Sequence, residues 1–301
     1  MNKKNPLQKK LKTEKRHLSW MLEALVTLMK TKPLGIFGGG VVILLLLTAL
    51  LAPSLAPYGY DDVVSKRLSA PSARFWMGTD YIGRDILSRI VYGARLSVFI
   101  GFGAIAIGTL GAALIGILTG YFGGKLDMLV QRVVDSIMAF PMLILIISVI
   151  AIIGLGILNL IFALGLLMAA NNSRVIRSAV LSIKESQYIE SAHATGAGHI
   201  RILFYHILPN VMPPIIVIAT VNIGSIILIE ASLSFLGLGV PPPNPSWGGM
   251  LSGQTMAFFR RAPWLALFPG AALSLTVFAF NMFGDALRDV LDPRLRGTMK
   301  G

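Results

Sequence analysis

Long uncharged stretches alternate with short charged segments along this chain. The stretches without Lys, Arg, Asp or Glu are 33–60, 96–124, 136–173, 202–229, 231–259 and 262–284. A helix needs about 20 apolar residues to cross the hydrocarbon core of a bilayer. The pattern therefore predicts a protein built from membrane-spanning helices.

Two of the stretches do not fit a single helix. As one helix, 136–173 would be ~57 Å long at 1.5 Å per residue, nearly twice the ~30 Å core. Gly154, Gly156 and Asn159 lie at its middle and suit a turn, so two spans are expected there. The second half of 231–259 is rich in proline and glycine and is expected to be a loop.

The resulting prediction is an all-α integral membrane protein with six transmembrane helices. The expected spans are 35–53, 96–121, 134–153, 157–172, 211–237 and 264–285. Nineteen Lys and Arg residues then lie on the side of the two termini, against eight on the other side. Since basic residues concentrate in cytoplasmic segments, both termini are predicted to be cytoplasmic.

The first 33 residues are expected to form a basic cytoplasmic tail with a short interfacial helix. The apolar residues at helical spacing in it are Leu18, Met21, Leu22, Leu25 and Met29. A disordered basic tail is the alternative for residues 1–16. The basic and apolar segments are both too long for a cleaved signal peptide, so we interpret the start as an uncleaved signal anchor.

The composition agrees with a membrane protein and excludes other classes. Apolar residues make up 54% of the 301 residues and charged residues 14%, whereas soluble domains carry about 25% charged residues. Mean hydropathy is +0.72. The chain has no cysteine, which excludes disulfides and thiolate metal sites. Its net charge of +13 is better explained by an anionic membrane surface than by nucleic acid.

Motifs for catalysis and for nucleotide or metal binding are missing. No GxxxxGK[ST], HExxH or GxSxG occurs, so a P-loop, a zincin site and a nucleophile elbow are excluded. His193 and His199 are six residues apart, which does not place them on one helix face, and with His206 they are expected to be solvated loop residues. No catalytic, cofactor or metal residue is therefore assigned, and a membrane enzyme or scaffold is a disfavoured alternative.

The predicted cytoplasmic loop 173–210 carries the most informative pattern. A helix is predicted over 183–195, and Gly196 should end it because glycine adopts backbone angles that other residues resist. A second helix is expected from Ile200 to Pro209. The small residues near the bend, which leave a smooth knob for another protein's groove, are Ser191, Ala192, Ala194 and Ala197.

This loop resembles the signature of ABC importer permeases: Glu-x-Ala, a glycine six residues after the glutamate, and Leu-Pro at the end. The match falls on Glu190, Ala192, Gly196, Leu208 and Pro209. Ser191 and His206 depart from the usual pattern. The resemblance implies that the loop is a coupling helix that docks on a separate ATPase subunit. The residues assigned to this coupling are Glu190, Ser191, Ala192, Gly196 and Pro209.

Three further stretches are similar to the C-type permease subunits of dipeptide and oligopeptide importers. They are GTDYIGRDILSR at 78–89, EASLSFLGLG with the proline-rich segment after it from Glu230, and the segment 280–293. The resemblance covers about 34–297. This range is the expected permease domain, between the tail 1–33 and the C-terminal residues 298–301.

The stretch 78–89 lies in the predicted outer loop 54–95. Thr79 or Asp80 can cap a helix start, and Asp85 with Arg89 has the spacing of an ion pair on a helix at the outer membrane surface. A surface helix without a specific role is the alternative. The candidates for an outer gate or a binding-protein contact are Gly78, Thr79, Asp80, Gly83, Arg84, Asp85 and Arg89.

Glu230 is an acid inside a predicted span, where a charge is costly and usually functional. It lies ~26 Å along the helix from Pro213, near the outer end of the membrane. Two interpretations stay open. The carboxylate either reaches the outer interface or a backbone donor, or it lies in the translocation path.

The resemblance implies a type I ABC importer permease of the cell inner membrane, forming half of a pore beside a second homologous permease. Its other partners would be two ATPase subunits that hold ATP and Mg, an external binding protein and membrane lipid; this chain would hold no cofactor. The expected cargo is a di- or oligopeptide, with nickel, glutathione or an oligosaccharide as alternatives. A stand-alone secondary transporter is disfavoured, since no charged or broken helix pair is evident at the midplane.

Overall fold

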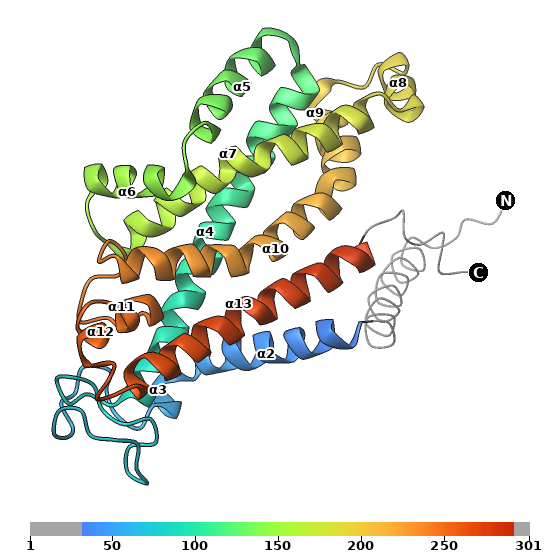
Figure 1. Ribbon diagram of the computed structural model, residues 1–301. Coiled ribbons are helices and arrows are strands. Elements are labelled where there is room, and N and C mark those ends of the chain that lie inside the picture. Colours follow the sequence, from blue (N-terminus) through green and yellow to red (C-terminus); the bar gives the residue numbers. More distant parts are fainter. Residues whose placement is uncertain (1–31, 292–301) are drawn as a thin grey trace, which may run out of the picture.

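The computed structural model describes residues 32–291, so the expected interfacial helix near residues 18–29 lies outside the described residues. The described part is almost entirely helical, with two isolated β-bridges, Val63–Arg84 and Thr79–Asp85, as its strand-like pairs. Figure 1 shows long helices extending between two ends of the molecule. We call them the α8 end, which carries helix α8, and the loop end, which carries residues 51–85 and 236–263.

Five helices are long and apolar enough to cross a membrane. They are α2 (Pro33–Leu50), α4 (Ile86–Phe122), α7 (Ile157–Lys184), α10 (Leu208–Phe235) and α13 (Trp264–Leu291). The shorter elements are α3 (Ala52–Leu55), α5 (Gly124–Met138), α6 (Met142–Ile153), α8 (Gln187–Ala194), α9 (His199–Ile202), the π-helical turn η1 (Leu203–Ile207), α11 (Trp247–Leu251) and α12 (Gln254–Phe258). Each of these long helices overlaps one of the six expected spans.

The remaining expected span, 134–153, is not one straight helix. Helices α5 and α6 meet at an angle of 96°. Pro141 lies at the break; proline lacks the N–H of the helical ladder and disfavours helical angles at the residue before it. With 12 residues, α6 alone is too short to span the core. The described chain therefore has five candidate spans, or six if the bent pair counts as one.

Helix boundaries differ from the expectation at two further places. Helix α4 begins at Ile86, so the expected surface helix and the span after it form one continuous helix. The helix after Gly196 does not end at Pro209 but continues through η1 into α10. Pro209 lies in the first turn of α10, and the π turn before it shifts the hydrogen-bond register.

Helices α4 and α7 pack closely through small residues. A side chain on Gly116 would lie 2.7 Å from the carbonyl oxygen of Ser173, and one on Gly165 would lie 2.7 Å from Ile107. Small residues let helix backbones approach in this way inside membranes. Helix α5 is joined to α7 by Arg177, which donates two hydrogen bonds to Asp127 at 2.6 and 2.5 Å, and by an Arg174–Asp135 ion pair.

Candidate functional site

Helix α8 and the turn after it project from the α8 end of the molecule (Figure 1). We call residues 187–198 the coupling knob. Gly196 has φ of +81°; its N–H donates to the carbonyl of His193 at 2.9 Å, and the N–H of Ala197 donates to that of Ala192 at 3.0 Å. This bond pair is the Schellman motif, which needs a left-handed residue. The expected break at Gly196 is therefore present.

The knob presents small and polar side chains outward. Glu190, Ser191 and Gly196 are exposed and Ala192 is half-buried. Ile189, at 1% exposure, anchors the helix in the core. Within residues 32–291, Glu190 takes part in no ion pair. Its carboxylate is therefore available to a basic group on a partner.

Pro209, the fifth residue assigned to coupling, lies in α10 and outside the knob. Its side chain is exposed. Just before it in the chain lies an exposed apolar surface that the sequence motifs did not indicate. Three large side chains stand out there: Ile200 at 75% exposure, Phe204 at 62% and Tyr205 at 77%. The i, i+4 spacing of Ile200 and Phe204 was a signal for this face. The face borders an open hollow lined in part by Gly198, Arg201 and His206.

The base of the knob is joined to α4 and α7 by a polar junction. The hydroxyl of Tyr121, in the last turns of α4, lies 2.8 Å from Nδ1 of His199. Nζ of Lys184, at the end of α7, donates to the carbonyl of Tyr121 at 2.7 Å. Tyr121 is 4% exposed. His199 is exposed, as expected of a loop histidine, but it also connects α9 to α4, which spacing alone did not indicate.

At the loop end, Asp80 is the centre of a buried polar cluster. Its Oδ1 accepts hydrogen bonds from the backbone N–H groups of Ile82, Gly83 and Arg84 at 2.8 to 3.0 Å. Its Oδ2 accepts one from Nε of Arg84 at 2.8 Å and lies 3.9 Å from Nε of Arg89. One carboxylate thus closes the turn and lies beside two guanidinium groups.

The two arginines connect this turn to the start of the outer loop. Arg84 donates to Asp61 at 3.1 Å, and Arg89 donates to the carbonyl of Tyr60 at 2.8 Å. Burial lowers the pKa of Arg84, but its bonds to Asp80 and Asp61 outweigh burial and raise the pKa overall. The guanidinium therefore stays charged and holds the loop together.

Asp85 does not pair with Arg89, as its spacing suggested, but caps helix α4. Its Oδ2 accepts from the backbone N–H and the hydroxyl of Ser88, both at 2.7 Å. The expected cap residue Thr79 instead bonds to the carbonyl of Lys66 and the N–H of Ser69, at 2.9 Å each. The helix start lies more than a turn later than expected, because several residues of this stretch can cap a helix.

The glycines of this stretch allow close backbone contacts. Gly78 and Gly83 have φ of +77° and +106°, and a side chain on Gly78 would lie 2.7 Å from the carbonyl of Ser69. All seven candidate residues of the stretch are buried. They are brought together, but they organise the loop and do not present their side chains at its surface.

Glu230 is 1% exposed, so its carboxylate is buried among the other side chains of this chain. Its Oε1 accepts a hydrogen bond from the hydroxyl of Ser234 at 2.7 Å. The same hydroxyl accepts from the N–H of Val240 at 3.2 Å. The acid therefore connects α10 to the segment that leaves it at the loop end. Its Oε2 has no hydrogen-bond partner among the described residues.

The segment after α10 packs back into the helices. Trp247 is 1% exposed and donates from Nε1 to the carbonyl of Ile90 in α4 at 3.1 Å. Gly248 lies so close to the backbone of Ala231 that any side chain there would clash. Between residues 32 and 291, no three acidic or histidine side chains gather as metal ligands would.

Comparison with known proteins identifies similar sequences over most of the chain. The family model described as "Binding-protein-dependent transport system inner membrane component" matches residues 112–297. The model "N-terminal TM domain of oligopeptide transport permease C" matches residues 27–71.

Three curated proteins are similar along nearly their whole length. A dipeptide transport system permease protein of Alkalihalophilus pseudofirmus is 44% identical over 91% of this chain and 90% of its own. A di/tripeptide transport system permease protein of Pseudomonas aeruginosa is 39% identical, with coverage of 86% and 88%. A glutathione transport system permease protein of Escherichia coli O157:H7 is 43% identical, with coverage of 85% for each chain.

Proposed function

The chain belongs to the binding-protein-dependent transport system inner membrane components, and from this premise we propose that it forms half of the pore of an ATP-driven peptide importer. A second, homologous permease would supply the other half. The chain itself catalyses no reaction; two ATPase subunits hydrolyse ATP, since the sequence has no P-loop.

The observation that carries this proposal is the coupling knob. It projects from the bundle and presents small side chains beside Glu190, which forms no ion pair with the described residues. It thus offers a close-fitting surface to a partner protein. The exposed side chains of Ile200, Phe204 and Tyr205 beside it add the aromatic and aliphatic anchors that are enriched at energetically important interface positions. We propose that the ATPase docks on both surfaces.

Three connections can transmit a movement of the knob to the pore. Ile189 fixes α8 in the core, and the Tyr121–His199 bond joins the base of the knob to α4. The helical segment from His199 to Phe235 has 37 residues, about 55 Å at 1.5 Å per residue. A displacement at the α8 end is therefore passed to the loop end, as alternating access requires.

This docking sets the orientation of the chain. The ATPase works in the cytoplasm, so the α8 end is cytoplasmic in this proposal. The start of α2 and the end of α13 lie at the same end (Figure 1), where Lys32 and Asp289 form an ion pair at 2.7 Å. Both termini are then cytoplasmic, in agreement with the distribution of Lys and Arg.

The loop end would receive the external binding protein. The cluster around Asp80 gives the outer loop a defined shape, so its residues position the contact surface. Trp76, with 72% exposure, and Val63, with 64%, are large side chains presented by that loop. Exposed tryptophan is enriched at binding hot spots, and we propose that Trp76 contacts the binding protein.

The proposed cargo is a di- or tripeptide, on the similarity to the dipeptide and di/tripeptide permeases. Glutathione is the second candidate, on the similarity to a glutathione permease. The test is ATP-dependent uptake of a labelled dipeptide by cells that express the complete importer, with and without this chain. Uptake that depends on the chain supports the proposal, and competition by glutathione separates the two cargoes. Absence of dipeptide and glutathione uptake would reject both.

A further inference from the structure

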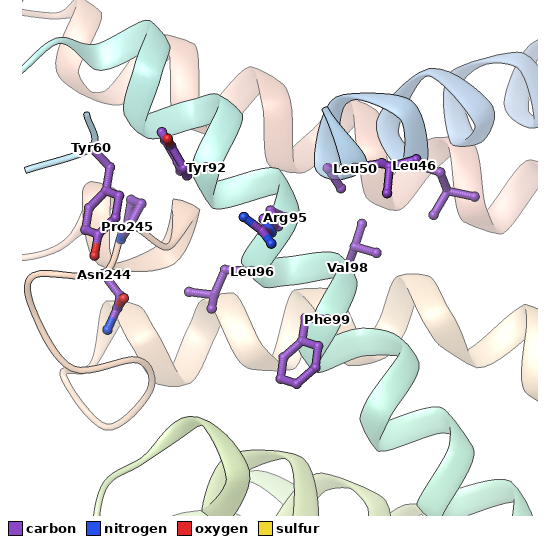
Figure 2. Close-up of a pocket in the computed structure, with 11 residues that line it drawn as sticks. Leu46, Leu50, Tyr60, Tyr92, Arg95, Leu96, Val98, Phe99, Asn244 and Pro245 are labelled. Carbon is purple, nitrogen blue, oxygen red and sulfur yellow. The ribbon is translucent and has the colours of Figure 1, made fainter. Parts of the chain in front are cut away.

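A slot of about 600 Å³ opens near the loop end between α2, α4 and the residues Asn244 and Pro245. Figure 2 shows the side chains that line it. This volume is in the range of small-molecule binding sites. The residues that line the slot belong neither to the coupling knob nor to the cluster around Asp80. One connection exists: the backbone carbonyl of Tyr60 accepts a hydrogen bond from Arg89 of that cluster.

The lining is polar at one end and apolar at the other. Tyr60, Tyr92 and Asn244 lie toward the loop end, and the two tyrosine rings pack edge to face with centroids 5.2 Å apart. Farther from the loop end are Leu46 of α2 and Val98 and Phe99 of α4. Because both helices are candidate spans, this gradient follows the direction from the membrane surface toward its centre.

Arg95 lies where the two parts of the slot meet. It is nine residues into α4 from Ile86, about 14 Å along the helix. Figure 2 shows its guanidinium in the middle of the slot, between Tyr92 and the apolar side chains of Leu96 and Val98. Arg95 is exposed, and no carboxylate of the described residues forms an ion pair with it. A guanidinium without a carboxylate partner, beside an apolar lining, favours an anionic ligand.

We propose that the slot binds one anionic phospholipid, with the phosphate on Arg95 and an acyl chain along Leu46, Val98 and Phe99. The tyrosine hydroxyls and the Asn244 amide would donate hydrogen bonds to the headgroup. Leu50 and Phe99 are 74% and 55% exposed, so the slot is open sideways, where a lipid can enter from the bilayer. A free peptide fits less well because its ammonium group needs an acid, and no Asp or Glu of residues 32–291 lines the slot.

The test uses the full chain in detergent, titrated with phosphatidylglycerol and followed by native mass spectrometry. Arg95→Gln should need about tenfold more lipid for the same occupancy, since it loses a charge-assisted hydrogen bond, and Arg95→Lys should lose less. Arg260→Gln is the matched control, because this exposed arginine also lies at the loop end but outside the slot. It should bind lipid like the unmodified chain.

A second variant tests the apolar wall. Val98→Trp fills the slot without a charge change and should also weaken lipid binding, while helicity by circular dichroism stays unchanged. Equal occupancy in Arg95→Gln and the unmodified chain would overturn the proposal. Displacement of phosphatidylglycerol by a dipeptide or by inorganic phosphate would also contradict it, and would assign the slot to that ligand.

Discussion

Ser234 is the residue through which the buried acid of α10 acts on its surroundings. Its hydroxyl donates to Glu230 and accepts from the N–H of Val240, so a single oxygen joins a carboxylate to the segment that follows the helix. Removing it leaves the buried Oε1 of Glu230 and the half-buried N–H of Val240 without this hydrogen bond. A buried polar group without a partner costs about 1–3 kcal/mol.

Replacement of Ser234 by alanine should therefore lower the free energy of unfolding of the purified chain by about 1–3 kcal/mol. Ser232→Ala is the matched control, since that exposed hydroxyl donates only to the carbonyl of Leu228 in its own helix. Thermal unfolding in detergent measures both. Equal melting temperatures for the two variants would show that the Glu230–Ser234–Val240 connection has no structural role.

Asp80 holds the outer loop together in the way that Ser234 holds the segment after α10. Asp80→Asn removes the charge that pairs with Arg84, and trypsin should then cleave the loop at Lys66, Arg67 or Arg74 about tenfold faster, because cleavage follows the population of the opened loop. Asp62→Asn is the control, since Asp62 accepts only from the N–H of Gly59. A loop that stays equally resistant in both variants would contradict this account.

The outer stretch shows what residue patterns can and cannot predict. Its glycines and charges marked 78–89 as important, and the structure brings them together. Spacing suggested an Asp85–Arg89 pair, but Arg89 turns to Asp80 and to the carbonyl of Tyr60. Such partners are distant in sequence or depend on the turn geometry, so periodicity along one helix could not find them.

At the scale of elements, the junction at the base of the knob determines how α8 moves with α4. Tyr121→Phe removes one hydrogen bond of about 0.5–1.5 kcal/mol and keeps the buried ring. In proteoliposomes with the complete importer, ATP hydrolysis should continue while the peptide transported per ATP falls. Tyr81→Phe, at the loop end, should leave this ratio unchanged.

A second variant separates a specific bond from general loosening. If Tyr121 and His199 act through one hydrogen bond, His199→Ala should reduce the transport ratio and should add little to Tyr121→Phe. Additive losses in the double variant would mean that the two side chains act independently, and the proposed junction would be wrong.

Hydrophobic length predicted most of the helices because a span must hide about 20 residues from water. It did not predict the 96° bend between α5 and α6, since a proline inside an apolar run changes backbone hydrogen bonding without changing hydropathy. Pro209 was taken as a helix end because proline usually breaks a helix, whereas the π turn before it lets the helix continue.

At the scale of the whole molecule, the motif in loop 173–210 indicated the function more specifically than the helical fold does. Family similarity, the missing P-loop and the projecting knob together lead to an importer whose energy comes from separate ATPases. The orientation of the chain in the membrane and the identity of its partners are inferred from surfaces that are exposed in the single chain. They follow from the proposal and are testable only in the assembled complex.

The most direct measurement is a pull-down of the tagged chain from its native membranes. The unmodified chain should bring down an ATPase and a second permease. Gly196→Asp places a charged side chain on the knob at a residue with a left-handed backbone conformation. This variant should no longer bring down the ATPase but should still bring down the second permease. Gly124→Asp is the matched control, because Gly124 is also left-handed and has open space around it, and it should keep both partners. Retention of the ATPase by Gly196→Asp, or isolation of the unmodified chain alone, would contradict docking at the coupling knob.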